Sequence, residues 1–229
     1  MTAPLAVDLF CGLGGWTEGL LAEGYYVVGF DIEQHVYGEH RYPAQLVIQD
    51  VLTLHGSQFK DAALIVASPP CQAYSYRAMP WKRAKALPPP DNSLFEACFR
   101  IQREACEAAG RHIPMVVENV RGAQKWVGRA RWNFGSYYLW GDVPALMPMT
   151  LKASKVPGFR FDGSGKSFQT ASVAQTGVKG STRKTRGEYP VIQPQVVGQW
   201  SKSSGRKMAS AMIAKIPLPL SRHIARAFR

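Results

Sequence analysis

Residues 5–15 read LAVDLFCGLGG, an apolar run that ends in a turn rich in glycine. The run at 5–10 is short and contains a β-branched residue, as is typical of a buried strand, and residues 16–23 have helical spacing. A strand, a glycine turn and a helix in this order predict the first unit of a sheet whose strands are connected through helices.

The same alternation continues through the first 144 residues. Further buried strands are predicted at 25–30, 45–48, 62–67 and 115–117, and helices at 34–41 and 92–109. This order predicts an α/β fold with a mostly parallel sheet that is covered on both faces. Because ligands bind at the carboxyl ends of the strands in such sheets, we expect the residues that follow the strands to meet at one edge.

Positive charge is concentrated in the last third of the chain. The net charge is +12, and residues 145–229 carry 15 Lys and Arg against two Asp and Glu, whereas residues 1–144 carry 13 against 14. This excess favours a polyanionic partner, above all a nucleic acid, over a merely solvated surface. We expect an α/β domain at 1–144 and a small, basic, loop-rich recognition module at 145–200. A disordered linker is the alternative for residues 145–200. We expect the C-terminal segment at 201–229 to return to the first domain.

Length and composition exclude several classes of protein. With 229 residues, of which 46% are hydrophobic, the chain can bury a core, unlike a disulfide-stapled miniprotein or a disordered chain. No apolar run is long enough to span a membrane, and the first residues do not resemble a targeting signal, so we expect a cytoplasmic protein. The four cysteines lack zinc-site spacing, so no metal is expected, and each is either a core residue or a nucleophile.

A cysteine and a glutamate follow two of the predicted strands. Ser68-Pro69-Pro70-Cys71-Gln72 comes directly after the strand at 62–67, and its two prolines stiffen the loop that carries Cys71. Glu118-Asn119-Val120 comes directly after the strand at 115–117. A lone glutamate there is alternatively a helix cap. Together, a stiffly held thiol and a carboxyl group at one edge of the sheet favour a nucleophile and an acid.

Three segments, DLFCGLGG at 8–15, SPPCQ at 68–72 and ENV at 118–120, together resemble the motifs of the cytosine-C5 DNA methyltransferases, in that family's order. The resemblance covers about residues 5–144 and, more faintly, the last 25 or so, and it suggests a short phage or bacterial member. It implies a Rossmann-like methyltransferase fold with S-adenosylmethionine as cofactor. The residues that it implies for cofactor binding are Phe10, Cys11, Gly12, Gly14, Gly15, Asp31, Ile32, Asp50, Val51, Pro69 and Ser210.

Two acids in this set keep an alternative role. An acid after the second strand, such as Asp31, can accept both hydroxyl groups of a ribose, and Glu33 lies beside it. The resemblance implies that Asp50 lies near the adenine amino group. Either aspartate is alternatively the cap of the segment that follows it.

The resemblance also implies the chemistry of the cysteine and the glutamate. Cytosine C5 is a poor nucleophile, so Cys71 first adds to C6, while Glu118 binds the N3 and N4 edge and helps to protonate N3. Arg131, which precedes an aromatic strand predicted at 132–140, is implied at the carbonyl oxygen of the cytosine. Solvated arginines at 129 and 131 are the alternative.

A cytosine within a duplex has to be flipped out before this chemistry, so the implied partner is double-stranded DNA. We expect the protein to be a monomer. The basic and aromatic segment at 72–90 suits a lid over DNA, or else is an ordinary surface loop. Four of the ten residues at 177–186 are Lys or Arg, which suit phosphate contacts. The residues proposed to bind substrate are Pro70, Gln72, Ser75, Arg77, Asn119, Arg129, Lys179, Arg183, Lys184 and Arg186.

The chain departs from the family pattern at three points. Val127 stands where a glutamine usually begins the arginine motif, and that motif lies closer to Glu118-Asn119-Val120 than usual. Ser210-Ala211 stands where the last motif, followed by a helix expected at 221–228, usually has Gly-Asn. A transferred alkyl group other than methyl, an RNA cytosine methyltransferase, a non-catalytic DNA-binding relative and a dinucleotide-dependent dehydrogenase are the alternatives.

Overall fold

The computed structural model describes residues 2–74, 88–148, 207, 211–212 and 214–229, and the backbone of two short strands at 182–185 and 189–192. The chain divides into two compact units. The first contains Met1–Val36, His40–Ala153 and Lys215–Arg229, and the second contains Tyr37–Glu39 and Ser154–Ala214. The second unit holds an antiparallel hairpin of β8 (Thr182–Thr185) and β9 (Tyr189–Ile192).

The first unit is built on one sheet, which has seven strands within the described residues, in the order β3-β2-β1-β4-β5-β7-β6. The strands from β3 to β5 in this order run parallel, and β7 and β6 are antiparallel to their neighbours. The predicted mostly parallel α/β fold is confirmed. The bounds are β1 (Leu5–Leu9), β2 (Tyr26–Asp31), β3 (Gln45–Ile48), β4 (Leu64–Ala67), β5 (Met115–Asn119), β6 (Trp132–Phe134) and β7 (Tyr137–Gly141).

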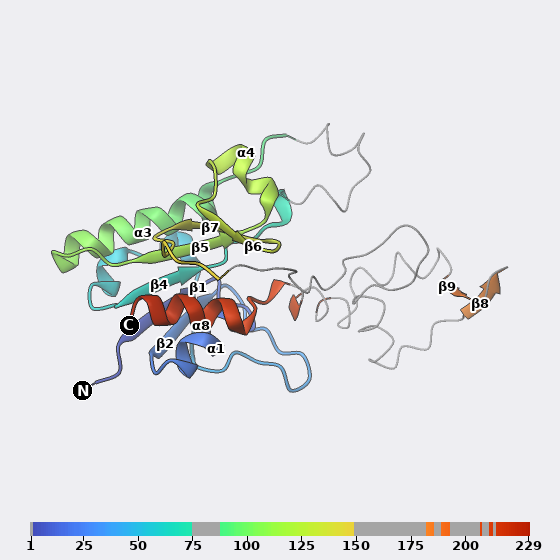
Figure 1. Ribbon diagram of the computed structural model, residues 1–229, viewed down its shortest axis with the longest axis horizontal. Coiled ribbons are helices and arrows are strands. Elements are labelled where there is room, and N and C mark those ends of the chain that lie inside the picture. The colour runs from blue at the N-terminus through green and yellow to red at the C-terminus, as the bar shows by residue number, and fades with distance from the viewer. Residues whose placement is uncertain are drawn as a thin grey trace. The chain divides into compact units, whose positions relative to one another are not determined.

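Helices cover the two faces of this sheet (Figure 1). The long helix α3 (Ser93–Ala109) lies on one face, and α1 (Gly15–Ala22) and α8 (Leu218–Ala227) lie together on the other. The remaining elements are short: α4 (Gln124–Val127) and the 3₁₀ turns η1 (Val51–Thr53), η2 (Gly56–Phe59), η3 (Gln72–Tyr74) and η5 (Arg121–Ala123).

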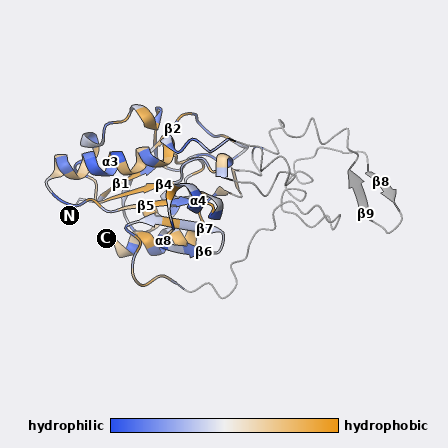
Figure 2. Cartoon of the chain, turned by 90° about the horizontal axis from the view of Figure 1, so that it is seen from above, coloured by the Kyte–Doolittle hydropathy of each residue, from blue (hydrophilic) through white to orange (hydrophobic). Residues whose placement is uncertain are grey.

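The two faces of the sheet form two apolar cores, because successive residues of a strand point to opposite sides. On β1, Val7 and Leu9 pack with the α3 face, whereas Ala6 packs with α1 and α8. The buried residues of α3 recur every three or four positions, as its amphipathic sequence requires. Figure 2 shows the apolar central strands between helices of mixed colour.

The helix predicted at 34–41 is wrong, because the chain forms a turn at 38–39 between bridge residues at 37 and 40. Gly38 has a φ of +61°, which is a left-handed conformation that ends a helix. Beyond it, Tyr42 is buried against the backbone of Gly29, and Pro43 packs beside Gly14. The packing of Tyr42 and Pro43 therefore overrides the helical spacing of the residues before them.

The strand predicted at 132–140 is two strands, because the chain reverses at residues 135–136. Gly135 has a φ of +60°, which allows the tight turn between β6 and β7. The helix predicted at 221–228 begins earlier, at Leu218, with Pro217 as its N-cap residue. A proline in the first turn is compatible with a helix because the N–H that it lacks would have no partner there.

The helices α1 and α8 are in close contact. Glu23 forms ion pairs with Arg222 and Arg226, with N–O distances of 2.6 and 2.9 Å. Gly19 lies against Ser221 so closely that a Cβ at Gly19 would overlap both the side chain and the main chain of Ser221.

We therefore expect Gly19→Ala to lower the free energy of unfolding by about 1–3 kcal/mol, although alanine is the better helix former. Equilibrium unfolding in urea measures this change. Ala22→Ser, at an exposed position of the same helix, is the control and is expected to change stability by less than about 0.5 kcal/mol. Equal stability of the two variants would contradict the close packing of α1 on α8.

Candidate functional site

The glycine turn after β1 has an unusual backbone. Phe10, Gly12 and Gly14 have positive φ values of 58°, 50° and 76°. A left-handed conformation is strained at a residue other than glycine, and such residues cluster at ligand sites. A Cβ at Gly12 would meet nothing within 4 Å, whereas one at Gly14 or Gly15 would overlap its neighbours in the fold. The turn is therefore packed from behind and open in front of Gly12.

Asp31 ends β2 and is held in place by the turn. Its Oδ2 accepts a hydrogen bond from the Gly12 N–H at 2.8 Å, and its Oδ1 accepts one from the Ile32 N–H at 2.8 Å. His35 Nε2 lies 3.7 Å from Oδ1. No helix follows Asp31, so its alternative role as a helix cap is excluded. Ile32 is 69% exposed, which leaves an apolar side chain at the surface beside the carboxylate.

Asp50 follows β3 and caps the turn η1, because its Oδ1 accepts a hydrogen bond from the Leu52 N–H at 2.9 Å. The capping role that the sequence left open is therefore real, and it uses one carboxylate oxygen. Val51, the first residue of η1, is buried. The ends of β1, β2 and β3 thus bring the turn, Asp31 and Asp50 to the same edge of the sheet.

A buried aspartate behind the turn was missed by the sequence analysis. Asp8 on β1 is fully buried, and its Oδ2 accepts a hydrogen bond from the Thr17 hydroxyl at 2.6 Å. Its Oδ1 has no partner within the described part of the chain, and burial raises the pKa of its carboxyl group to about 7. The signal in the sequence was a single acid within the apolar run LAVDLF.

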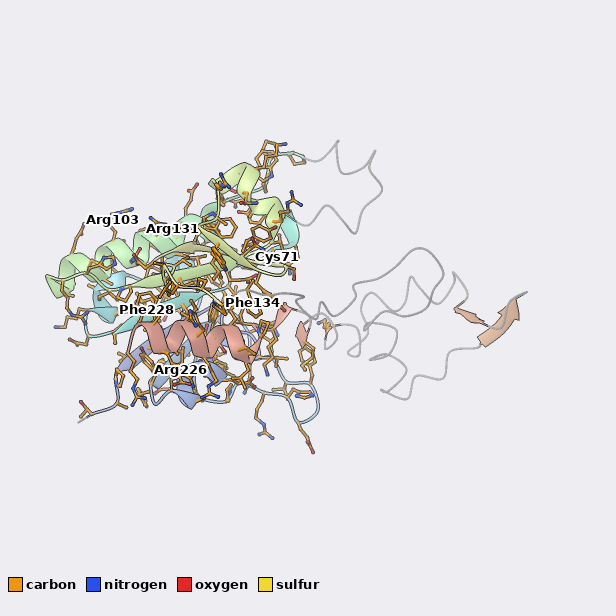
Figure 3. All side chains as sticks on the ribbon, in the orientation of Figure 1. Cys71, Arg103, Arg131, Phe134, Arg226 and Phe228 are labelled. Atoms are coloured by element: carbon orange, nitrogen blue, oxygen red, sulfur yellow. The ribbon has the colours of Figure 1, made fainter. Side chains whose placement is uncertain are left out.

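The cysteines differ in their surroundings. Cys11 and Cys98 are buried, and burial raises the pKa of both thiols far above the ordinary value. Cys106 accepts a hydrogen bond from the Ile113 N–H. Cys71 instead lies in the loop that follows β4, at the edge of the sheet (Figure 3). The structure therefore favours Cys71 as the nucleophile.

The loop that carries Cys71 is anchored on both sides. Before it, the Asn119 Nδ2 donates a hydrogen bond to the Pro69 carbonyl oxygen at 2.9 Å. After it, the Tyr74 N–H donates to the Cys71 carbonyl oxygen, and the buried Tyr74 hydroxyl donates to Asn92 Oδ1. Asn119 is only 1% exposed. Its amide therefore favours a role in positioning the loop over the substrate contact predicted for it.

Glu118 lies within β5, whereas the sequence predicted that it follows the strand. It is 9% exposed, and burial raises the pKa of its carboxyl group to about 8, so that it is largely protonated at neutral pH. The Ser68 hydroxyl group opposes part of this rise in the pKa. Ala67 on β4 is opposite Val117 on β5, so the Cys71 loop and Glu118 leave adjacent strands at the same level.

A small cavity of about 250 Å³ lies beside the Cys71 loop. Pro69, Pro70 and Gln72 form one side, and Ser93 and Leu94 at the start of α3 form the other. The helix was predicted from the sequence, but no role was predicted for its first turn. Spacing alone could not find it, because the two sides of the cavity are brought together only by the packing of α3 on the sheet.

Residues 5–126, which include the turn after β1, the Cys71 loop and Glu118, match the family of C-5 cytosine-specific DNA methylases. The match covers more than half of the chain. The chain belongs to this family. Its resemblance to the cytosine-C5 DNA methyltransferases, based on three short motifs, is therefore confirmed.

Solved structures of methyltransferases are also similar to this DNA methylase family member. One, described as a DNA modification methyltransferase encoded within an E. coli prophage, has 26% identity and a TM-score of 0.39, over 55% of this chain and 35% of that one. The S. pombe Dnmt2 methyltransferase has 17% identity and a TM-score of 0.37, over 55% and 37%. The Entamoeba histolytica methyltransferase EhMeth has 15% identity and a TM-score of 0.39, over 56% and 41%.

The matched part thus spans well under half of those three structures. No curated protein matches the chain. Within the described residues, no helix is long and apolar enough to cross a membrane, and no cluster of His, Cys, Asp and Glu is suited to hold a metal ion.

The arginines predicted to contact the cytosine are on the surface. Arg129 and Arg131 are both exposed, and the Arg131 N–H donates a hydrogen bond to the Leu139 carbonyl oxygen. Leu139 is opposite Glu118 in the sheet, so β7 lies between Arg131 and the glutamate. Ser75, Arg77, Lys179, Arg186 and Ser210 lie outside the described residues, as do the side chains of Arg183 and Lys184 on β8.

Proposed function

We propose that this chain transfers a methyl group from S-adenosylmethionine to C5 of a flipped-out cytosine in duplex DNA. The observation that carries the proposal is the arrangement at the ends of β4 and β5. A thiol on an anchored loop and a buried, protonated carboxyl group leave neighbouring strands at the same level. A cysteine nucleophile and an acid are the two groups that activation of cytosine C5 requires.

The turn after β1 and the two aspartates fit the cofactor. The open space in front of Gly12 suits a ligand close to the backbone, and the oriented carboxylate of Asp31 suits ribose hydroxyl groups. The carboxylate oxygen of Asp50 that does not cap η1 suits an amino group of adenine, next to the exposed Ile32. Phe10, Cys11, Gly14, Gly15, Val51 and Pro69 complete the proposed site. The cofactor supplies an electrophilic methyl group.

Cys71 acts on the cytosine ring. Its thiolate adds to C6, so that a sulfur–carbon bond forms and electron density moves toward C5 and N3. C5 is then nucleophilic enough to accept the methyl group. A water molecule then takes the proton from C5, and Cys71 leaves C6 as a thiolate, which restores the C5–C6 double bond. N3 returns its proton to Glu118, so the aromatic ring and the enzyme are both restored.

Glu118 provides the acid for this addition. Negative charge that builds up at N3 requires a proton, and a carboxyl group with a pKa of about 8 holds one at neutral pH. A carboxyl group with the ordinary pKa would be ionised and would repel that charge. Burial of Glu118 is therefore part of the proposed catalytic mechanism.

DNA is the proposed substrate because the last third of the chain is strongly basic. Near the site, Gln72, Arg129 and Arg131 are exposed and available for contacts with the duplex. We propose that residues 145–200 form the recognition region, with Lys179, Arg183, Lys184 and Arg186 at phosphates. Ser75 and Arg77, in the segment after Cys71, and Pro70 are proposed contacts to the flipped nucleotide.

Transfer of a labelled methyl group to purified nucleic acids tests this function. We expect incorporation into duplex DNA that exceeds incorporation into transfer RNA by about 100-fold or more, because the flipped cytosine has to be held by contacts that suit one helix form. Hydrolysis of the product to nucleosides should give 5-methylcytosine. A preference for transfer RNA would assign the same chemistry to RNA, and label in neither substrate would contradict the proposed function.

A further inference from the structure

The loop after β4 is docked at two points on the turn that follows β5. Ahead of Cys71, the Asn119 Nδ2 donates a hydrogen bond to the Pro69 carbonyl oxygen at 2.9 Å. Behind Cys71, the Tyr74 carbonyl oxygen lies so close to Gly122 that a Cβ at Gly122 would overlap it. The two contacts therefore lie on either side of the proposed nucleophile.

The residues that form these contacts are themselves held in place. Asn119 Oδ1 accepts a hydrogen bond from the Val120 N–H at 2.8 Å, so the amide nitrogen is the atom that faces the loop. Tyr74 is 3% exposed and packs in the core on the α3 side of the sheet. Its hydroxyl group donates a hydrogen bond at 2.9 Å to Asn92 Oδ1, at the N-cap position of α3. The docked loop is therefore fixed relative to both β5 and α3.

The main chain of Tyr74 excludes a side chain at Gly122. The turn η5 leaves Gly122 only partly buried, so the core is not what excludes a side chain there. Apart from its chain neighbours, the three atoms nearest to a Cβ at Gly122 all belong to Tyr74, and two of them are its carbonyl carbon and oxygen. Main-chain atoms cannot move aside by a change of rotamer. A side chain at this position would therefore push the Cys71 loop away from the turn after β5.

The chain between these contacts and the proposed reacting groups is short. Cys71 is two residues from one docked residue and three from the other, and Glu118 directly precedes Asn119. The Tyr74 N–H donates a hydrogen bond to the Cys71 carbonyl oxygen, which closes the turn between them. Consecutive Cα atoms are about 3.8 Å apart, so neither reacting group can move far while both contacts hold.

We infer that Tyr74 and Gly122 are positioning residues that set the separation between the proposed nucleophile and the proposed acid. In the proposed reaction Cys71 attacks C6 while Glu118 protonates N3, so both have to reach one pyrimidine ring at the same time. A displacement of about 1 Å in such an arrangement can lower the rate about 10²-fold. The docking of the loop is a property of the fold, whereas its effect on catalysis rests on the proposed function.

Amide hydrogen exchange, followed by mass spectrometry on the protein without DNA or cofactor, tests the docking. We expect Gly122→Ala to speed exchange of the amides at 71–74 about tenfold or more, because the displaced loop opens more easily. Gly19→Ala is the matched control, since its Cβ also overlaps a packed main chain, but on the other face of the sheet. It should change exchange at 71–74 by less than about twofold. Equal exchange at 71–74 in wild type and Gly122→Ala would overturn the inference.

Methyl transfer to duplex DNA tests the effect on catalysis. We expect Gly122→Ala to reduce the maximal rate about 100-fold while the dissociation constant for S-adenosylmethionine changes by no more than about threefold. Isothermal titration calorimetry measures that constant. Gly19→Ala should keep the maximal rate of the folded protein within about twofold. Equal losses of rate in the two glycine variants would show a general effect of destabilisation and overturn the positioning role.

Tyr74→Phe is a milder variant that keeps the ring and removes the bond to Asn92. Loss of one hydrogen bond is expected to speed exchange at 71–74 about fivefold and to lower the maximal rate about threefold. If Gly122→Ala does not fold, this variant decides, and unchanged exchange at 71–74 in it overturns the inference.

The two measurements separate the inference from the proposed function. If exchange responds as expected while the wild-type protein transfers no methyl group to DNA or RNA, the docking stands and the proposed function fails. If the wild type transfers methyl groups while both variants keep its exchange and its maximal rate, the proposed function stands and the inference fails.

Discussion

Duplex DNA containing 5-fluorocytosine is expected to trap the wild-type protein covalently, and Cys71→Ser is expected to abolish the adduct. The fluorine at C5 cannot leave as a cation, so the enzyme cannot break the bond between Cys71 and C6 after methyl transfer. A serine hydroxyl is a far weaker nucleophile than a thiolate, so turnover on ordinary DNA should fall by about 10³-fold or more. Denaturing gel electrophoresis detects the adduct as a band of reduced mobility that survives heating.

A second cysteine provides the matched control for this experiment. Cys106→Ser changes a partly buried thiol on α3 whose sulfur accepts a hydrogen bond from the Ile113 N–H. It should leave the amount of adduct unchanged, because Cys106 lies near the end of α3, whereas Cys71 lies in the loop that follows β4. Equal amounts of adduct in wild type and Cys71→Ser would show that the proposed nucleophile is wrong.

Glu118→Gln is expected to reduce turnover by about 10²- to 10⁴-fold while changing the dissociation constant for DNA by no more than about threefold. The amide has nearly the same size and shape as the carboxyl group, but it has no acidic proton for N3. The loss therefore falls on the transition state, where charge builds up, and not on binding. Single-turnover kinetics and fluorescence anisotropy measure the two quantities separately.

The pH dependence provides an independent check on Glu118. Its folded pKa of about 8 is raised above the ordinary value, so the carboxyl group is protonated below that pH and ionised above it. Single-turnover rates of the wild type should therefore decline as the pH rises through about 8, and Glu118→Gln should lack this limb. Comparable losses of turnover and DNA affinity in Glu118→Gln would point to a structural role instead.

Most strands of the sheet could be predicted because each is a short apolar run that a turn ends. Residues 45–48 were predicted with the observed bounds, and the other parallel strands differ by one or two residues at one or both ends. The helix at 34–41 could not be rejected from spacing. The packing of Tyr42 and Pro43 on the sheet outweighs the helical periodicity of this segment. The spacing of apolar residues carries no information about that packing.

The candidate site divides in the same way. Cys71 and Glu118 were found because each stands in a compact motif at the end of an apolar run. Asp8 was overlooked because a single acid within a strand has no partner nearby in the sequence. Its bond with Thr17 exists only because α1 turns back over β1. The position of Arg131, with β7 between it and Glu118, likewise depends on the hairpin that the sequence analysis read as one strand.

The sequence by itself determined the order of strands and helices, the chemical groups available at their ends and the family to which the chain belongs. These properties are local, since apolar runs, glycines and prolines act on the residues next to them. Only the tertiary structure decided the state of those groups. Burial between two layers of helices raises the pKa of Glu118 to about 8, and the hydrogen bond from Trp16 to Ser68 joins α1 to the residue that follows β4. Side chains 52 positions apart interact only after the sheet has formed, because desolvation and hydrogen bonding depend on distance in space.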